Sequence, residues 1–264
     1  MLRFLGYLMV YFLMVNYSIA ASLAQMTVND PALGARSITY KVHRRYAIVE
    51  GDIILGRIVN QKLMGATVVN NISGGHWPHG IVPFELSIDL PDETVHAVLN
   101  AMYVLQQHTN IKFVVRKKQN QQKYPDYLLF VPSDGKTCFS AVGKKGGQQE
   151  IILGKRCRTM FVVHEIMHAL GFWHEQSRHD RDFFVRIVWE NISEEHAYNF
   201  NQHLSESKDY GDYDYQSIMH YSATAFSKNG EPTIIPLQAD VKIGQREKLS
   251  EGDIEAINAM YPES

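Results

Sequence analysis

The residues of this chain that could perform chemistry are concentrated in one short run of three histidines and one glutamate. His164 and His168 are four positions apart, so on a helix their imidazoles lie on one face and can bind the same metal ion. Glu165 falls beside that ion, where it suits a general base acting on metal-bound water. Gly171 can adopt the left-handed conformation that ends a helix, so the chain can turn back and bring in His174. The spacing predicts a catalytic zinc site.

A bare pair of histidines around a glutamate also occurs by chance in ordinary, partly buried helices. The glycine and the third histidine that follow at regular spacing argue against that alternative. The other nine of the twelve histidines lack ligand spacing, and we expect them at surface or packing positions; examples are His76, His79, His96 and His108.

The elements that position this run belong to a chain of 264 residues, which is long enough for one large domain or two modest ones. Hydrophobic residues make up 45% of it, enough for a core. The 26 basic and 28 acidic residues give a formal net charge of −2. Neither sign dominates, so we expect no nucleic-acid partner and no attraction to an anionic membrane.

Residues 1–24 have the pattern of a secretory signal peptide. Arg3 precedes an apolar stretch at 4–15, and small residues follow, with cleavage expected after Ala20 or Ala24. The alternative is an uncleaved membrane anchor, but the stretch is short for a bilayer span, which needs ~20 apolar residues. We therefore predict a secreted, extracellular protein with no stable membrane association.

The chain has two cysteines, Cys138 and Cys157, both just before the zinc run. In an oxidising compartment we expect them to form a disulfide. Closing a loop of this size would stabilise the fold by about 3 kcal/mol, chiefly by restricting the unfolded chain. Two free thiols in a reducing compartment are the alternative, which depends on the signal peptide.

Sequence patterns predict the surrounding elements. Segment 25–64 has mixed polarity and is expected to be extended rather than a domain. The prolines within 77–84 predict an edge strand or the entry to a loop. Periodicity predicts a helix over 92–107, capped by Asp92, with a buried face of Val95, Val98, Leu99, Met102 and Leu105. Further predictions are strands at 111–115, 127–131 and 149–153, the zinc helix over 158–170, a hairpin turn at Asn229-Gly230, and a last helix capped by Ser250 and Asp253 with Ile254, Ile257 and Met260 inward.

The extended zinc run resembles the astacin family of metzincin metallopeptidases. Glu175, directly after the third histidine, sets astacins apart from other metzincins, which are the nearest enzyme alternative. Downstream, the sequence Ser-Ile-Met-His-Tyr at 217–221 resembles the family's Met-turn. The resemblance covers about 77–261 and includes further matching patterns at 138–147, 178–182 and 244–246.

This resemblance implies an α+β catalytic domain over 66–264 with two lobes, a twisted N-terminal sheet and one Zn²⁺ between the lobes. It implies an endopeptidase that hydrolyses peptide bonds in proteins through zinc-activated water. Glu165 would act as general base and acid, and Tyr221 would help to stabilise the tetrahedral oxyanion. Met219 would lie beneath the zinc. Taken alone, Met219 and Tyr221 would more simply be core residues.

The resemblance also implies a zymogen. The sequence Val-Glu-Gly-Asp at 49–52 resembles the family's inhibitory motif, in which Asp52 would occupy the water position on the zinc. Without the family, an aspartate after a glycine would be interpreted as a turn residue. Residues 25–65 would form the inhibitory propeptide, cut by an activating protease near Ala66, and Glu175 would pair with the new amino terminus. No cysteine lies in this segment, which excludes a matrixin-type cysteine latch.

Arg246 stands where the family often places a basic side chain in the pocket for the residue after the scissile bond. The positive charge of Arg246 predicts a preference for acidic substrate residues directly after the scissile bond. The alternative is a surface arginine paired with Glu247 or Glu251.

The chain departs from the family at a second disulfide. Asn110 stands where the family usually has a cysteine, and the partner cysteine expected after Tyr261 is also missing. The link between the two ends of the domain is therefore left open.

Together these features predict a secreted zinc metalloendopeptidase made as a zymogen. We expect a monomer whose partners are protein or peptide substrates and an activating protease. The alternative from another class is a secreted zinc-containing binding protein without catalysis, which would have no need of Glu165 or Tyr221.

Overall fold

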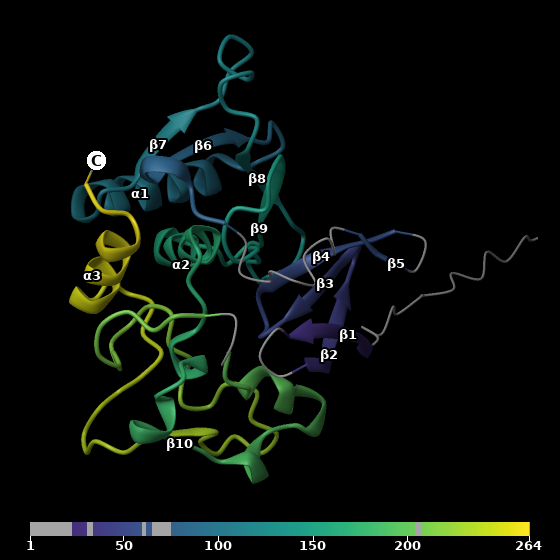
Figure 1. Cartoon of the computed structure of the whole chain (residues 1–264), viewed down its shortest axis with the longest axis vertical. Coiled ribbons are helices and arrows are strands. Elements are labelled where there is room, and N and C mark those ends of the chain that lie inside the picture. Colours follow the sequence, from purple (N-terminus) through teal and green to yellow (C-terminus); the bar gives the residue numbers. More distant parts are fainter. Residues whose placement is uncertain (1–22, 31–33, 60–61, 65–74, 204–206, 264) are drawn as a thin grey trace, which may run out of the picture.

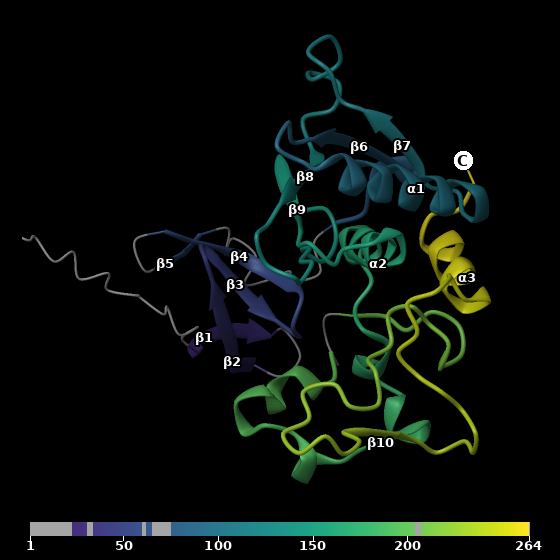
Figure 2. The ribbon, with the colours of Figure 1, turned by 180° about the vertical axis from the view of Figure 1, so that it is seen from behind.

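The computed structural model describes residues 23–30, 34–59, 62–64, 75–203 and 207–263. Most of the predicted signal peptide and the predicted cut near Ala66 lie outside these residues. The described chain forms an upper lobe (residues 75–171), a lower lobe (residues 172–203 and 207–249) and a separate sheet beside them (Figure 1). The predicted zinc helix lies at the centre of the molecule in both views (Figures 1 and 2).

The separate sheet, here called the first sheet, is an antiparallel meander. Its strands are β1 (Leu23–Asp30), β2 (Gly34–His43), β3 (Tyr46–Val49), β4 (Ile53–Val59) and β5 (Lys62–Met64). The segment is extended, as predicted, but its strands also pair with one another in a sheet that the sequence reasoning did not foresee. All four residues of β3 are buried, because they pack against the catalytic lobes as well as against the sheet. Mixed polarity along the segment concealed this two-sided burial.

The upper lobe contains a parallel sheet in the order β7-β6-β8-β9. Its strands are β6 (Ile81–Leu86), β7 (Lys112–Val115), β8 (Tyr127–Pro132) and β9 (Gln148–Leu153), close to three of the predicted strands. The predicted edge strand was wrong, because β6 has a neighbour on each side. Pro83 is tolerated there because it pairs with β7 alone, and pairing with β8 begins one residue later, at Phe84.

Two helices, α1 (Asp92–His108) and α2 (Thr159–Leu170), pack against each other beneath this sheet (Figure 2). The predicted cap of α1 was wrong: Pro91 holds the cap position and Asp92 lies in the first turn, where its charge complements the helix dipole. Leu99 is 45% exposed rather than buried. The buried stripe runs instead through Ala97, Val98, Ala101, Met102 and Leu105.

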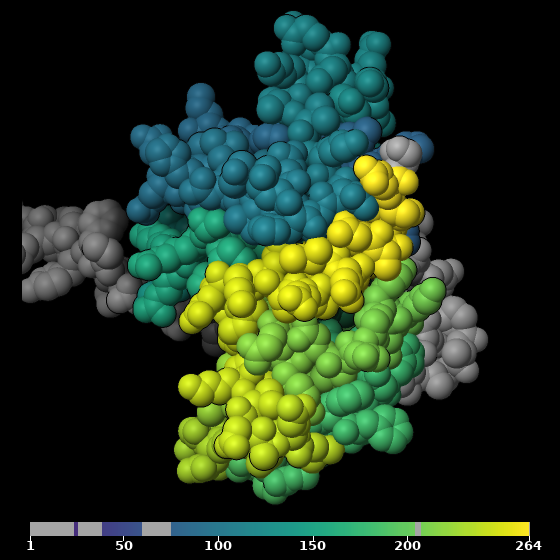
Figure 3. All heavy atoms as spheres, turned by 90° about the vertical axis from the view of Figure 1, so that its left-hand side faces the viewer, coloured from purple at the N-terminus to yellow at the C-terminus, as the bar shows by residue number. Residues whose placement is uncertain are grey.

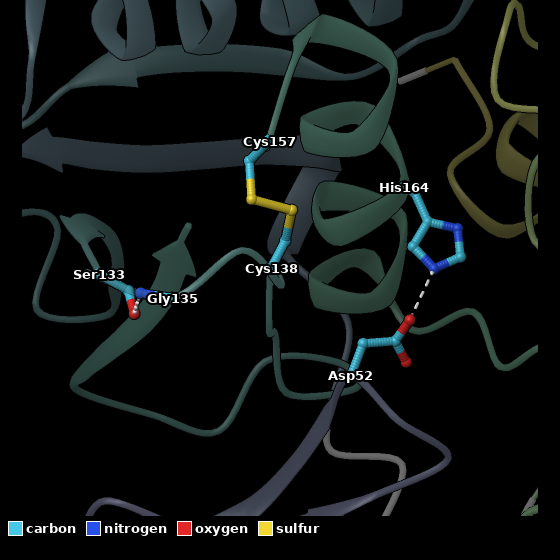
Figure 4. The surroundings of a disulfide bond; sticks show 6 residues. All are labelled: Asp52, Ser133, Gly135, Cys138, Cys157 and His164. Carbon is cyan, nitrogen blue, oxygen red and sulfur yellow. Dashed lines mark hydrogen bonds and ion pairs between the residues drawn. A yellow bond between two sulfur atoms is a disulfide. The ribbon is translucent and has the colours of Figure 1, made fainter. Parts of the chain in front are cut away.

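The predicted disulfide is present between Cys138 and Cys157, with their Cα atoms 6.0 Å apart. Both cysteines are buried in the main hydrophobic cluster, next to the start of α2 (Figure 4). The bridge therefore connects the loop after β8 to the segment that leads into the zinc helix.

The lower lobe has little regular structure beyond short 3₁₀ turns and the pair β10 (Val185–Ile187) and β11 (Ile234–Pro236). Side-chain bonds of Ser227 and Asn229 hold a bend at Gly230, whose φ is 84°. The bend is where a tight turn was predicted, but no two-stranded hairpin flanks it. A separate hydrophobic cluster forms the core of this lobe.

The last helix, α3 (Glu251–Met260), begins with the predicted capping box of Ser250 and Asp253. Ile257 is fully buried, while Ile254 and Met260 are partly buried against the main core. Figure 3 shows this C-terminal segment spread across the boundary between the two lobes. No described helix combines the length and the apolar character needed to cross a membrane.

Hydrogen bonds of Asn110 join the two ends of the predicted domain. Its backbone N–H donates to Asn258 Oδ1 at 2.8 Å, and its side-chain Nδ2 donates to the Tyr261 carbonyl at 3.1 Å. Amide hydrogen bonds therefore connect the end of α1 to the end of α3 at the position where the family usually has a disulfide and this chain lacks the cysteines.

Candidate metal centre

The zinc helix α2 is held in the core by burial around its whole circumference. Every residue from Val162 to Leu170 is buried, and the apolar ones belong to the main cluster. Gly171 has a φ of 123° and ends the helix, as predicted. The ligand pair on α2 is therefore fixed by packing before any ion binds.

Two aromatic side chains bind the last carbonyls of α2. The Trp77 indole N–H donates to the Ala169 carbonyl at 2.8 Å, and the Tyr261 hydroxyl donates to the Leu170 carbonyl at 2.5 Å. Carbonyls at the end of a helix have no partner within the helix, and burying them without one is costly. These bonds fix the last turn, which carries the second histidine.

Each of the three predicted ligands donates its Nδ1 proton to a nearby acceptor. His164 Nδ1 lies 2.9 Å from the Ile218 carbonyl, and His168 Nδ1 lies 2.8 Å from the Phe172 carbonyl. His174 Nδ1 lies 2.7 Å from a carboxylate oxygen of Glu50. A proton held on Nδ1 leaves Nε2 with a free lone pair, as in metal-binding histidines.

The free atoms of the site converge on one point. One ligand atom from each of Asp52, His164, His168 and His174 can be chosen so that all lie within 4.8 Å of one another. Asp52 oxygens lie 3.3 Å from Nε2 of His164, 3.6 Å from Nε2 of His168 and 3.3 Å from Nε2 of His174. Two ligands at about 2.0–2.1 Å from a tetrahedral zinc ion stand about 3.3 Å apart.

Hydrogen bonding supports the same interpretation. Nε2 of His168 and of His174, and Oδ1 of Asp52, are buried without a hydrogen-bond partner. Buried polar atoms normally have partners, and a metal ion would supply one for all three atoms at once. Three nitrogens and one carboxylate oxygen are a donor set typical of zinc. The residues present therefore fit one zinc ion, and Figure 4 shows Asp52 facing His164 next to α2.

Glu165 lies one residue after the first ligand and is 2% exposed. Its Oε2 is also buried without a partner. Burial, and then the negative charge of Asp52, raise the pKa of Glu165 well above its usual value. A carboxyl group in this environment can hold a proton and release it, which general acid-base catalysis requires.

Tyr221 and Met219 lie on the lower-lobe side of the site. The Tyr221 ring stands 4.6 Å from the His174 ring, measured between centroids. Its hydroxyl donates to the backbone carbonyl of Glu50 at 2.6 Å. Met219 is buried in the main cluster, and its carbonyl accepts from the Glu175 N–H at 3.1 Å. The Met-turn segment thus contacts the loop that carries the third ligand.

Glu50 is the site residue that the sequence reasoning missed. It is 4% exposed and contacts His174 and His203 through its two carboxylate oxygens. Burial alone would raise its pKa, but His203 and then His174 outweigh this and lower the pKa of Glu50 to about 2. No local spacing could have found it, because its partners lie more than a hundred positions downstream.

Gly51 has a clear steric role in the turn between β3 and β4. Its φ is 86°, and a Cβ atom built on it would lie 2.8 Å from Cζ of Phe226. Real Cβ atoms essentially never approach that closely. The absence of a side chain therefore lets the turn enter the space between the lobes and bring Asp52 to the histidines.

Glu175 is buried and already has partners. One carboxylate oxygen accepts from the Asp214 N–H at 2.8 Å and lies 3.6 Å from Nε of Arg178. Burial raises the pKa of Glu175 to about 8, and the nearby Arg178 opposes that rise. Glu175 also lines a cavity of about 490 Å³. Its pairing with a new amino terminus stays a prediction.

Arg246 lies close to the metal centre. Its Nη1 donates to the His220 carbonyl at 3.0 Å and to the Gln245 carbonyl at 2.8 Å. Among the described residues it forms no ion pair with Glu247 or Glu251, and its role in substrate preference remains a prediction. Its backbone anchoring leaves other guanidinium donors for a ligand.

Comparison with known proteins gives a consistent family. The family model described as Astacin, a peptidase family, matches residues 69–262. Zinc metalloproteinase nas-4 of Caenorhabditis elegans is 37% identical over 225 residues, covering 80% of this chain and 68% of that protein. Meprin A subunit beta of Homo sapiens is 38% identical, covering 81% of this chain and 29% of that protein.

A solved structure agrees with these matches. High choriolytic enzyme 1, a hatching enzyme zinc-protease from Oryzias latipes, has a TM-score of 0.63 and 38% identity, over 72% of this chain and 94% of that chain. This chain spans less than two thirds of the length of several curated relatives. The chain belongs to the astacin family of zinc metallopeptidases, and the predicted α+β fold and single zinc site are confirmed.

Proposed function

We propose that this chain is the precursor of a secreted zinc endopeptidase that hydrolyses peptide bonds in proteins. The observation that carries the proposal is the convergence of three histidine side chains, together with the buried, unpartnered Oε2 of Glu165, the residue that follows the first of them. A protein that only bound zinc would not need a buried carboxyl group next to its ligands. The predicted signal peptide at 1–24 and the single disulfide support secretion.

The residues of the site divide the reaction among them. His164, His168 and His174 would hold zinc, which when bound supplies Lewis acidity for polarising a peptide carbonyl and lowering the pKa of water. Glu165 takes the proton of the attacking water and passes it to the leaving amine. The hydroxyl of Tyr221 donates a hydrogen bond to the oxyanion that develops on the substrate.

The same geometry supports a latent precursor. Asp52 lies 3.3 Å from Nε2 of both His164 and His174, so its carboxylate occupies the position that water needs. The hydroxyl of Tyr221 is bonded to the Glu50 carbonyl and is not free for a substrate. In this proposal residues 25–65 are the inhibitory propeptide, and a separate protease removes them. Glu175 then receives the new amino terminus, and Arg246 faces the residue after the cut.

The decisive test uses the secreted full-length chain. We expect about one zinc per chain, little peptidase activity before trimming, and hydrolysis of a peptide library after limited proteolysis near Ala66. A chelator should abolish hydrolysis, and added zinc should restore it. A trimmed protein that retains zinc and folds normally but cleaves no peptide would favour a zinc-containing binding protein instead.

A further inference from the structure

The Glu50 side chain lies in a polar pocket next to the metal centre. One carboxylate oxygen of Glu50 accepts from Nδ1 of His174 at 2.7 Å and faces Ser177 Oγ at 3.4 Å. The other oxygen accepts from Nε2 of His203. We call the three donor side chains, His174, Ser177 and His203, the carboxylate pocket.

The carboxylate pocket is built from buried and supported groups. His174 and Ser177 are each 1% exposed, and the ring of His203 stacks on Trp173 with centroids 3.8 Å apart. Stacking of this kind restricts the orientation of an imidazole and so fixes its donor. All of these residues belong to the lower lobe, and none of them lies in the first sheet.

The main chain of Glu50 is also recognised. Its N–H donates to Asn199 Oδ1 at 2.8 Å, and its carbonyl accepts from the Tyr221 hydroxyl at 2.6 Å. The lower lobe therefore binds Glu50 by both backbone groups and by its carboxylate. These polar contacts are specific for a carboxylate side chain, which apolar packing alone would not be.

Removing the first sheet would leave these groups without their acceptor. A buried donor that loses its partner costs about 1–3 kcal/mol, and more when the lost partner is charged. Water can satisfy such donors in part, but an incoming carboxylate restores charge-assisted bonds of the same kind. A peptide that follows the path of the turn to the histidines would pass the pocket, because Asp52, two residues after Glu50, lies among them.

We propose that His203, Ser177 and Nδ1 of His174 form a subsite for one acidic side chain of a peptide substrate, which Glu50 fills in the precursor. The proposal rests on the proposed peptidase function. It adds a second acidic preference that is separate from the one expected of Arg246, which is anchored on the His220 carbonyl in a different segment.

The first experiment tests whether the pocket distinguishes a carboxylate from a neutral amide, and it uses the full-length chain. Hydrogen exchange of the amides in 49–53 is compared in the wild type, Glu50→Gln and Asp52→Asn, each with and without a chelator. We expect Glu50→Gln to speed exchange at least about tenfold in both conditions. Asp52→Asn should change exchange only while zinc is bound. Equal exchange in wild type and Glu50→Gln would overturn the pocket, whatever the peptidase activity.

The second experiment asks whether a substrate uses the pocket. Trimmed enzyme is profiled with peptides in which each Glu or Asp is compared with its own amide, and kcat/KM is measured at every position. We expect one position, other than the one directly after the cut, to favour the acid by roughly tenfold. His203→Gln and Ser177→Ala should each reduce that preference at that position alone. Zinc content and a thermal melt check that both variants fold.

His179→Gln serves as the matched control, because His179 pairs with Asp209 rather than with Glu50. Its profile should equal that of the wild type. A His203→Gln profile unchanged at every position would show that the pocket serves the precursor only, and it would overturn the proposal. If the trimmed protein cleaves nothing, the peptidase function fails, and the binding of Val-Glu-Gly-Asp-Ile-Ile against its Gln analogue by calorimetry still decides the pocket.

Discussion

The helix α2 and the turn at 49–52 bring ligands to the same point by opposite means. α2 is buried on all sides in the main hydrophobic cluster, and its last carbonyls are bonded by Trp77 and Tyr261. The turn connects two strands of the first sheet, and its residues Glu50 and Gly51 have φ values of 50° and 86°. Packing holds the helix, whereas hydrogen bonds and charge hold the turn.

The apolar contacts around the two regions differ in the same way. The main cluster combines both helices, the parallel sheet and the end of α3. The first sheet contacts the lobes through two small clusters, one around Ile48 and Ile54 and one around Val49 and Ile53. Because hydrophobic stabilisation scales with buried apolar area, we expect removal of the first sheet to leave the histidine site folded. In the proposed precursor, the three histidines are permanent ligands and Asp52 is a temporary one, and the two kinds differ in the interactions that hold them in place.

Replacing Glu165 tests the permanent side of this comparison. Glu165→Gln should keep zinc and the fold but lower kcat by about 100-fold to 10⁴-fold, the usual contribution of a positioned general base. Turnover by trimmed enzyme and metal content should be measured together. Glu85→Gln, on the distant strand β6, is the control and should have no effect on kcat. A zinc-loaded Glu165→Gln enzyme with normal turnover would remove Glu165 from the mechanism.

Replacing Asp52 tests the temporary side. Asp52 contacts three histidines, and a charge-assisted contact contributes roughly 1.5–3 kcal/mol. Asp52→Ala should therefore raise the peptidase activity of the uncut precursor by at least about 100-fold. Arg44→Ala, which breaks an exposed ion pair between the first sheet and Asp134, should leave the precursor latent. An Asp52→Ala precursor as silent as its parent would place the latch elsewhere.

The disulfide should stabilise the main hydrophobic cluster around α2 and should not affect how the turn at 49–52 is held. Changing both Cys138 and Cys157 to Ser should lower the free energy of unfolding by about 3 kcal/mol, as expected for a closed loop of this size. Urea unfolding of the variant, compared with oxidised wild type, measures the effect, and wild type treated with a reductant should match the variant. Latency of the precursor should not change. A loss below about 1 kcal/mol would mean that the loop is already ordered in the unfolded chain.

Arg246 is expected to give the smallest effect. Arg246→Ala should reduce the preference for an acidic residue directly after the cut by roughly 1.5–3 kcal/mol, the value of a hydrogen bond to a charged group. Kinetics with matched Glu and Gln peptides measure it, and Arg186→Ala on β10 is an exposed control. An unchanged acidic preference would show that other residues build that pocket.

Local sequence rules predicted the permanent side well. The histidine spacing, the glycine that ends α2, the capping box of α3 and the disulfide are each decided within a few turns of chain or by cysteine count. Asp52 was found only through the family resemblance. Glu50, the first sheet and the central position of β6 were missed, because long-range pairing decides them. A proline fits in the central strand β6 because only one neighbouring strand, β7, pairs at Pro83, and the sequence does not reveal that pairing.

The bonds that Trp77 and Tyr261 make to the end of α2 have a consequence for metal exchange. A last turn whose carbonyls are bonded to side chains from both ends of the domain cannot unwind by fraying, so His164 and His168 keep their spacing when the ion leaves. The entropy of ordering this pair is then spent during folding and not during metal binding. We therefore expect zinc to leave and return without a change in the spacing of His164 and His168.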